Sequence, residues 1–231
     1  MNTGVRHTGE KSLDQQLVKS HKPLPSVTDD SYTGEVQTNT MPDSSLNITS
    51  NRSARKYPWS EMVRRVLWMV GKYLVHWSPR PLFGWRRFVL RLFGAEIGTG
   101  VNIYPSATIY FPWKLTVGDW SAIGENALIY NLGPITIGEQ VTISQNAHLC
   151  AGTHDHTDPA MPLEKPPIAV RDQAWVCADA FVGPGVTVGE GAVVAARAVA
   201  VKDVDDWMIV GGNPARPVKR RELNNADPTA T

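Results

Sequence analysis

The chain has 231 residues, with 23 basic and 22 acidic side chains and a formal charge of +1, a balance that points to no polyanionic partner such as nucleic acid. Its 42% hydrophobic content is enough for a packed core, which excludes a chain that is disordered throughout. The two cysteines are too few for a disulfide scaffold, and Met1–Leu13 contain no apolar signal segment, so we expect a cytoplasmic protein.

Residues 1–55 are rich in Ser, Thr, Asn, Asp and Pro, and they show no sustained apolar period. A segment of this composition buries too little surface to offset the entropy of ordering the chain. We therefore predict a disordered tail.

Residues 56–94 are predicted to be a helical segment. Apolar residues recur every three or four positions over 57–77, which predicts an amphipathic helix, and a second short helix is expected near 85–93. Charges interrupt the first helix well before the ~20 apolar residues that cross a bilayer. Ten basic residues and one acid, Glu61, lie between Arg52 and Arg91. Basic residues beside Trp, Phe and Leu indicate contact with an anionic membrane surface, but a helical cap on a solenoid explains them equally.

Residues 95–203 carry a six-residue repeat. A large aliphatic residue opens each repeat, a small residue usually lies four places later, and glycine often follows the aliphatic residue, where we expect a tight corner. The aliphatic positions are Ile97, Ile103, Ile109, Val117, Ile123, Ile129, Ile137, Ile143, Leu149, Val170, Val176, Val182, Val188 and Val194. Three repeats make one triangular coil, so the pattern predicts a mainly β fold, a parallel β-helix of about five coils.

This repeat resembles the left-handed parallel β-helix of the hexapeptide-repeat transferases, and the likeness covers about residues 88–221. The left hand is implied by the resemblance alone, because parallel crossovers are normally right-handed. The resemblance also implies a homotrimer whose active sites lie between neighbouring chains. Residues 204–231 are then a closing segment and tail.

The repeat breaks over residues 150–169, and a long loop inside a compact repeat predicts an active site. Acyl transfer to an alcohol needs a base that titrates near neutral pH, as histidine does. Thr153-His154, followed by Asp158-Pro159, resembles the signature of the maltose and galactoside acetyltransferases, and this resemblance makes His154 the catalytic base. The loop is one residue longer here than in those enzymes, so Asp155, His156 and Asp158 are predicted only as substrate-binding residues.

The same resemblance assigns residues outside the loop. Asn126 aligns with a family residue that contacts the acceptor, although a corner asparagine of the coil explains it nearly as well. The residues predicted to bind acetyl-CoA are Trp175, Ala178, Ala196, Lys202 and Arg216. Arg216 ends a Gly-Asn-Pro-Ala-Arg closing motif and suits the CoA phosphates. Arg197 and Val201 replace a small residue and a threonine of the family, and Arg197 would either add a phosphate contact or crowd the CoA arm.

Segments 87–98 and 130–138, together with the start of the loop, resemble the acetyltransferases of colanic acid and related exopolysaccharide gene clusters. The predicted function is therefore acetyl transfer from acetyl-CoA to a hydroxyl of a nucleotide-linked or lipid-linked sugar, without a metal. The enzyme would work in the cytoplasm, with peripheral contact at the inner membrane if the basic helix binds lipid.

Two other classes stay open. The γ-carbonic anhydrases share this β-helix and bind zinc through three histidines, so His148, His154 and His156 allow a metal hydratase. Those enzymes, however, lack the acidic loop and the Asn-Pro-Ala-Arg ending. A catalytically silent β-helix scaffold is the second alternative, since Arg197 and the altered loop depart from the active enzymes.

Overall fold

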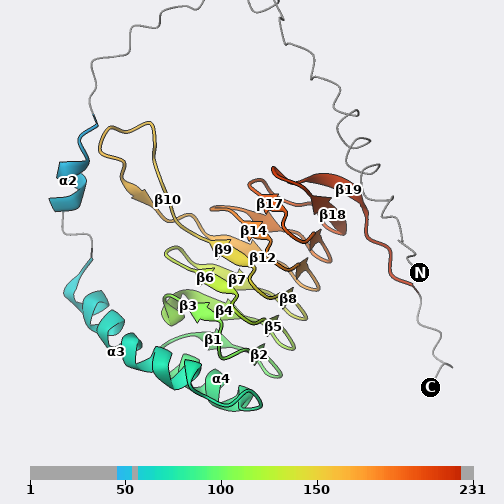
Figure 1. The fold of residues 1–231 in the computed structure, drawn as a ribbon, viewed down its shortest axis with the longest axis horizontal. Coiled ribbons are helices and arrows are strands. Elements are labelled where there is room, and N and C mark those ends of the chain that lie inside the picture. The colour runs from blue at the N-terminus through green and yellow to red at the C-terminus, as the bar shows by residue number, and fades with distance from the viewer. Residues whose placement is uncertain (1–45, 54–56, 225–231) are drawn as a thin grey trace, which may run out of the picture. The chain divides into compact units, whose positions relative to one another are not determined.

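The computed structural model describes residues 46–53 and 57–224, which all belong to one compact unit, residues 44–231 (Figure 1). Its helices are α2 (Ile48–Ser53), α3 (Trp59–His76) and α4 (Phe83–Leu92). The two helices predicted near 57–77 and 85–93 are α3 and α4. The predicted disordered tail differs at one place, because Ile48–Ser53 is helical; residues 1–45 of that tail lie outside the described residues.

Three parallel sheets form the faces of a triangular coil, and each stacks its strands in the order of the chain. Sheet A contains β1 (Glu96–Ile97), β4 (Leu115–Val117), β7 (Ile135–Ile137), β12 (Ile168–Val170) and β15 (Thr187–Val188). Sheet B contains β2 (Asn102–Ile103), β5 (Ala122–Ile123), β8 (Thr142–Ile143), β13 (Trp175–Val176), β16 (Val193–Val194), β18 (Met208–Gly211) and the antiparallel β19 (Arg216–Arg220). Sheet C contains β3 (Thr108–Ile109), β6 (Leu128–Tyr130), β9 (His148–Cys150), β14 (Phe181–Val182) and β17 (Val199–Ala200). We call the corner between a B strand and the following C strand the BC edge, and the next corner the CA edge.

The core is the stack of inward side chains inside this triangle. All fourteen predicted aliphatic positions are buried, and strands stack like on like, with Ile103 beside Ile123 and Ile123 beside Ile143. The predicted parallel β-helix is confirmed. Five coils are complete, and Val204, which bridges to Val188, begins a sixth that ends with β18.

The corners reveal a different role for glycine from the one predicted. The left-handed backbone falls three residues after most of the inward aliphatic residues, often without glycine, as at Asn126 (φ 56°) and Arg197 (φ 60°). The glycines directly after the aliphatic residues instead make room for the next coil. A Cβ on Gly118 would lie 2.6 Å from the carbonyl carbon of Gly138, and one on Gly124 would lie 2.8 Å from the nitrogen of Gln145. These glycines are required by close backbone approach.

The first coil is closed by hydrogen-bond donors from the helices. Along the solenoid the N–H groups of one coil donate to carbonyls of the next coil. The carbonyls of the first coil have no preceding coil to donate to them and need other donors. Arg86, Arg87 and Arg91 of α4 donate to the carbonyls of residues 103, 101 and 97 at 2.5, 2.8 and 2.6 Å, and Trp68 of α3 donates to that of residue 109 at 3.0 Å. The arginines of α4 therefore form the cap that was one of two interpretations of this basic segment.

Candidate active site

The predicted loop forms a hairpin that leaves the third coil at the CA edge, between β9 and β12 (Figure 1). Its strands, β10 (Thr153–His154) and β11 (Leu163–Glu164), pair antiparallel, with His154 opposite Leu163. The returning strand crosses close to the coil at Gly133. A Cβ there would press on the carbonyl of Lys165 and lie 2.8 Å from that of Pro166. The lack of a side chain at Gly133 thus allows the base of the hairpin to pack closely against the coil.

His154 lies exposed on β10, and its ring is held by one backbone group. Nδ1 is 2.8 Å from the carbonyl oxygen of Met161. A carbonyl oxygen only accepts hydrogen bonds, so Nδ1 must carry the hydrogen. In the neutral ring Nε2 then holds the free lone pair, which is the state that a general base needs.

Asp155 and Asp158 shape the turn of the hairpin. Oδ1 of Asp155 accepts hydrogen bonds from the nitrogen and the hydroxyl of Thr157, at 2.9 and 2.6 Å, and these bonds hold the pKa of Asp155 below its ordinary value. Oδ1 of Asp158 accepts from the nitrogen of Ala160 at 2.7 Å. Both aspartate side chains therefore stabilise the backbone of the turn. The nearby His156 is exposed.

Four of the other predicted residues of the acceptor and CoA sites lie on a different side of the coil. Asn126, Ala178 and Ala196 occupy the BC edge of the second, fourth and fifth coils, and Trp175 begins β13 nearby in sheet B, where its indole donates to Ser144 at 2.8 Å. Within one chain the structure does not bring Asn126 to His154, because the BC and CA edges are different corners of the triangle.

Lys202 and Arg216 are brought together at the C-terminal end of the solenoid. They line one cavity of about 310 Å³, whose wall also includes Val201. Arg197 is not part of this lining. Its side chain is 86% exposed, and Nε lies 3.9 Å from a carboxylate oxygen of Asp179. The cavity therefore offers two cations for phosphate, beside the carboxylates of Asp203 and Asp205, whereas Arg197 projects into solvent.

Comparison with known proteins identifies the family. No family model matches the chain. The acetyltransferase WcaF of Escherichia coli (strain K12), which is named for colanic acid biosynthesis, is 44% identical over 154 residues, or 67% of this chain and 85% of WcaF. A hexapeptide-repeat acetyltransferase from Vibrio cholerae has the same fold, with a TM-score of 0.67 and 25% identity over 72% of this chain and 95% of its own. The chain belongs to the hexapeptide-repeat acetyltransferases.

Two further solved structures with this fold contain a bound coenzyme. The Vibrio cholerae protein has also been solved with acetyl coenzyme A, at 24% identity and a TM-score of 0.66 over 73% of this chain and 93% of its own. A galactoside acetyltransferase in complex with coenzyme A matches with a TM-score of 0.67 and 20% identity, over 77% of this chain and 92% of its own. These two likenesses show the shared fold.

Within the described part of the chain, the histidines form no cluster that could hold a metal ion. His148 projects outward from β9, as its register predicts, but it packs between the rings of Tyr130 and Phe181, and burial lowers its pKa. Its Nε2 atom is buried without a hydrogen-bond partner. His154 lies on the hairpin, and across residues 46–53 and 57–224 no three His, Cys, Asp or Glu side chains are placed to hold a metal ion.

Sequence reasoning missed two residues of the hairpin environment. Met161 supplies the carbonyl that holds His154, and Asn51 of α2 donates to the same carbonyl at 2.7 Å. A backbone acceptor has no signature in the sequence, and a six-residue helix is too short to produce a helical period.

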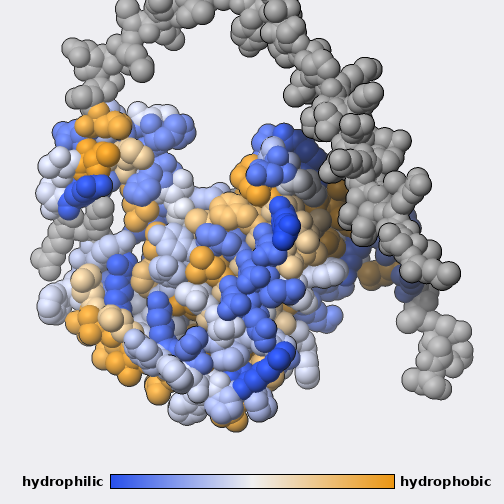
Figure 2. Space-filling view, viewed as in Figure 1, coloured by the Kyte–Doolittle hydropathy of each residue, from blue (hydrophilic) through white to orange (hydrophobic). Residues whose placement is uncertain are grey.

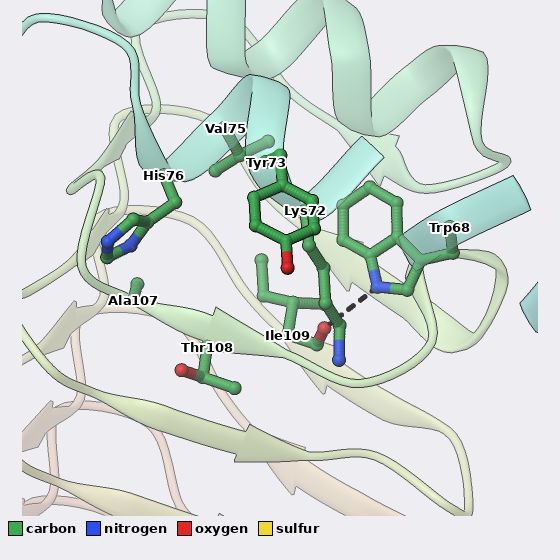
Figure 3. A pocket seen from close by; sticks show the side chains of 8 residues that line it. All are labelled: Trp68, Lys72, Tyr73, Val75, His76, Ala107, Thr108 and Ile109. Carbon is green, nitrogen blue, oxygen red and sulfur yellow. Dashed lines mark hydrogen bonds between the residues drawn. The ribbon is translucent and has the colours of Figure 1, made fainter. Parts of the chain in front are cut away.

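A separate cavity of about 180 Å³ lies between α3 and β3 (Figure 3). Trp68, Lys72 and His76 of α3 face Thr108 and Ile109 across it. None of the predicted site residues lines this cavity. Burial lowers the pKa of Lys72, whose ammonium lies 4.9 Å from the ring centre of Tyr110.

Proposed function

We propose that this enzyme transfers the acetyl group of acetyl-CoA to a hydroxyl of a sugar used in exopolysaccharide synthesis, with His154 as general base. The observation that carries the proposal is the hydrogen bond from Nδ1 of His154 to the carbonyl of Met161, which leaves Nε2 free to accept a proton. The likeness to WcaF, which is named for colanic acid biosynthesis, supports the choice of acceptor.

In the proposed reaction, Nε2 of His154 removes the proton of the acceptor hydroxyl while the hydroxyl oxygen attacks the thioester carbon. The C–S bond then breaks, and the acetyl group stays on the sugar oxygen. The imidazolium returns its proton to the departing CoA thiolate. The hydrogen bond from Nδ1 to Met161 persists throughout and keeps the ring in one orientation.

Lys202 and Arg216 are proposed to bind the phosphates of CoA. Both line the cavity at the C-terminal end, and cationic side chains suit phosphate oxygens. Trp175, Ala178 and Ala196 would line the path of the pantetheine arm along the BC side. Replacing Lys202 and Arg216 together by Ala should weaken CoA binding roughly a hundredfold, since a hydrogen bond to a charged group contributes about 1.5–3 kcal/mol. Isothermal titration with CoA measures this loss.

We further propose that the active unit is a homotrimer. Asn126 lies on the BC edge and His154 on the CA edge, so one chain alone does not join the proposed acceptor contact to the base. A neighbouring copy that places its BC edge against this CA edge completes the site. Sedimentation equilibrium gives the mass directly, and mixing Asn126→Ala chains with His154→Ala chains should restore activity at the interfaces that combine two intact residues.

The exposed face of α3 is proposed to rest on an anionic membrane at the cytoplasmic side, where a lipid-linked acceptor would be found. The helix is too short and too polar to span, and no helix in the described part of the chain is long and apolar enough to cross a bilayer. Yet the face turned away from the coil exposes a row of large apolar and aromatic side chains, and Figure 2 shows several hydrophobic residues at its lower left. It consists of Trp59, Met62, Val63, Val66, Met69, Val70, Tyr73 and Trp77. Arg64 and Arg80 of the same segment are exposed and add positive charge, which favours an anionic surface over a neutral one.

Vesicle sedimentation tests the membrane proposal. We expect the protein to pellet with vesicles of phosphatidylglycerol and to stay in solution with phosphatidylcholine. The double variant Val66→Glu/Val70→Glu should abolish pelleting, whereas Asn102→Glu on the exposed face of β2 should not. If the double variant instead changes the oligomeric mass and no vesicle is bound, a second copy of the chain covers this face.

The decisive test of the proposed base is His154→Ala. General base catalysis contributes about 10²–10⁴-fold, so the rate of acetyl transfer should fall by that factor. Thiol release from acetyl-CoA is followed with panels of nucleotide-linked and lipid-linked sugars. His76→Ala, an exposed histidine of α3, is the matched control. Transfer by His154→Ala at a rate near that of the wild type would show that another group is the base.

A further inference from the structure

Helix α2 rests against the tip of the active-site hairpin. The nitrogen of Asn47 donates to the carbonyl of Pro159 at 2.9 Å, and Nδ2 of Asn51 donates to the carbonyl of Met161 at 2.7 Å. These contacts join segments more than a hundred residues apart in the chain. A third contact holds the hairpin base, where the ammonium of Lys165 lies 4.7 Å from the ring centre of Tyr57. The residues that precede α3 thus brace the hairpin at two places.

The carbonyl of Met161 receives two hydrogen bonds. One comes from Nδ1 of His154 at 2.8 Å and the other from Asn51. A carbonyl oxygen has two lone pairs, so both donors can be satisfied together. The direction of this carbonyl therefore fixes the orientation of the imidazole, and Asn51 holds the same oxygen from the side of α2.

Met161 also has a backbone conformation that an unbranched L residue adopts at a cost. Its φ is 48°, in the left-handed region, while its nitrogen donates to the carbonyl of Asp158 at 2.8 Å. A strained residue persists only where surrounding contacts hold it. If Met161 relaxed, its peptide group would rotate and the carbonyl would leave Nδ1 of His154.

We propose that Asn51 is a positioning residue for catalysis: it holds the Met161 carbonyl in the direction that presents Nε2 of His154 to the acceptor. This inference rests on the proposed role of His154 as the base. Asn51 does not touch the reacting atoms. It acts through a single backbone oxygen, the carbonyl oxygen of Met161. Helix α2 therefore contributes to the geometry of the proposed active site.

The test compares Asn51→Ala with Asn51→Gln and with Arg52→Ala. Ala removes the donor, Gln keeps an amide donor on a longer side chain, and exposed Arg52 lies next to Asn51 on α2. We expect Asn51→Ala to lower kcat roughly tenfold to a hundredfold, because a small misplacement of a catalytic group has effects of that order. KM for acetyl-CoA should stay unchanged, Gln should recover part of kcat, and Arg52→Ala should match the wild type.

A second measurement follows His154 itself and does not depend on turnover. In protein labelled with ¹⁵N-histidine, the His154 signals, assigned by their loss in His154→Ala, should show a neutral ring protonated at Nδ1. Asn51→Ala should shift them toward the averaged values of a ring that exchanges tautomers. Unchanged signals together with unchanged kcat would overturn the positioning role.

The two measurements separate this inference from the proposed function. If His154→Ala keeps full activity, the base is misassigned, yet the tautomer signal still reports whether Asn51 orients the ring. If His154→Ala is inactive and Asn51→Ala keeps both its rate and its tautomer signal, the base stands and the positioning role falls. A fall in kcat for Asn51→Ala with an unchanged tautomer signal likewise contradicts positioning through Met161.

Discussion

The coil of this acetyltransferase and the hairpin that carries His154 are stabilised in different ways. Inward residues of the coil such as Ile123, Ile143 and Leu149 are 0% exposed, and the inner strands bond to a neighbour on each side. In the hairpin, β10 and β11 form a sheet of two strands, and His154 is exposed. The coil therefore draws its stability from buried apolar surface, whereas the hairpin holds its shape through a few polar contacts. Changes in the coil should alter stability, and changes in the hairpin should alter rate.

Arg86→Met should have the largest effect on stability. The arginine is 0% exposed and donates to Ser78, to the carbonyls of Pro79 and Arg80, and to that of Ile103 in the first coil. Its loss leaves several acceptors without a donor, and each buried unsatisfied group costs about 1–3 kcal/mol. We expect the free energy of unfolding in urea to fall by about 4 kcal/mol.

The matched control for this change is Arg87→Met. Arg87 is half-buried and has one hydrogen bond, to the carbonyl of Val101 at 2.8 Å. It should lose about 1 kcal/mol. Equal losses for the two variants would mean that the cap closes the coil by apolar packing of α4 and not by its buried donors.

Leu149→Ala and Leu163→Ala place the same substitution in the two regions. Leu149 is buried in the coil, and its loss should reduce the free energy of unfolding by about 3 kcal/mol while kcat stays near the wild-type value well below the melting temperature. Leu163 is half-buried opposite His154. Leu163→Ala should reduce the free energy of unfolding by less than about 1 kcal/mol, and it should lower kcat further than Leu149→Ala does. Urea unfolding and initial rates measure both. A slow but stable Leu149→Ala protein would contradict the division between coil and hairpin.

The sequence predicted the coil well because its repeat reports one physical quantity, the direction of each side chain. Six-residue spacing within each coil places Ile123 and Ile143 inside the triangle. It also identified the hairpin, because the repeat stops there. Glycine was assigned to the right positions for a different reason, since the space at Gly118 is taken by the next coil, which a single repeat does not reveal.

The parts that the sequence did not predict depend on atoms common to all residues. In the sequence, Arg86 is one of several basic residues of a basic segment. Its burial becomes understandable only in the fold, because the first coil has carbonyls that need donors. The support of His154 is a backbone oxygen, and the helix that carries Asn51 is six residues long within a polar tail. Such contacts exist only once distant segments have folded together.

Asp155→Ala tests how much the turn of the hairpin matters. The substitution removes the acceptor for both hydrogen bonds from Thr157, so the turn should loosen and kcat/KM should fall several-fold, while the free energy of unfolding changes by less than about 0.5 kcal/mol. Asp155→Asn keeps Oδ1 as an acceptor. If kcat/KM recovers in Asp155→Asn, the residue acts by stabilising the turn. If kcat/KM falls as far in Asp155→Asn as in Asp155→Ala, the charge of Asp155 acts in substrate binding. A fall in stability equal to that of Leu149→Ala would make the hairpin part of the coil's cooperative unit.

His148→Phe should have the smallest effect, and a pH dependence reveals it. Burial between Tyr130 and Phe181 lowers the pKa of His148 from its ordinary 6.5, so below that pH the unfolded chain binds a proton that the folded coil does not. Stability is unaffected above this pH and declines as the pH falls from about 6.5 toward the lower pKa of the folded state. Phenylalanine keeps an aromatic ring in the same stack but cannot be protonated, so its melting temperature should decline less between pH 6.5 and 5. Identical slopes for His148→Phe and the wild type would show that solvent reaches His148 and that sheet C is less tightly packed there than the coil interior.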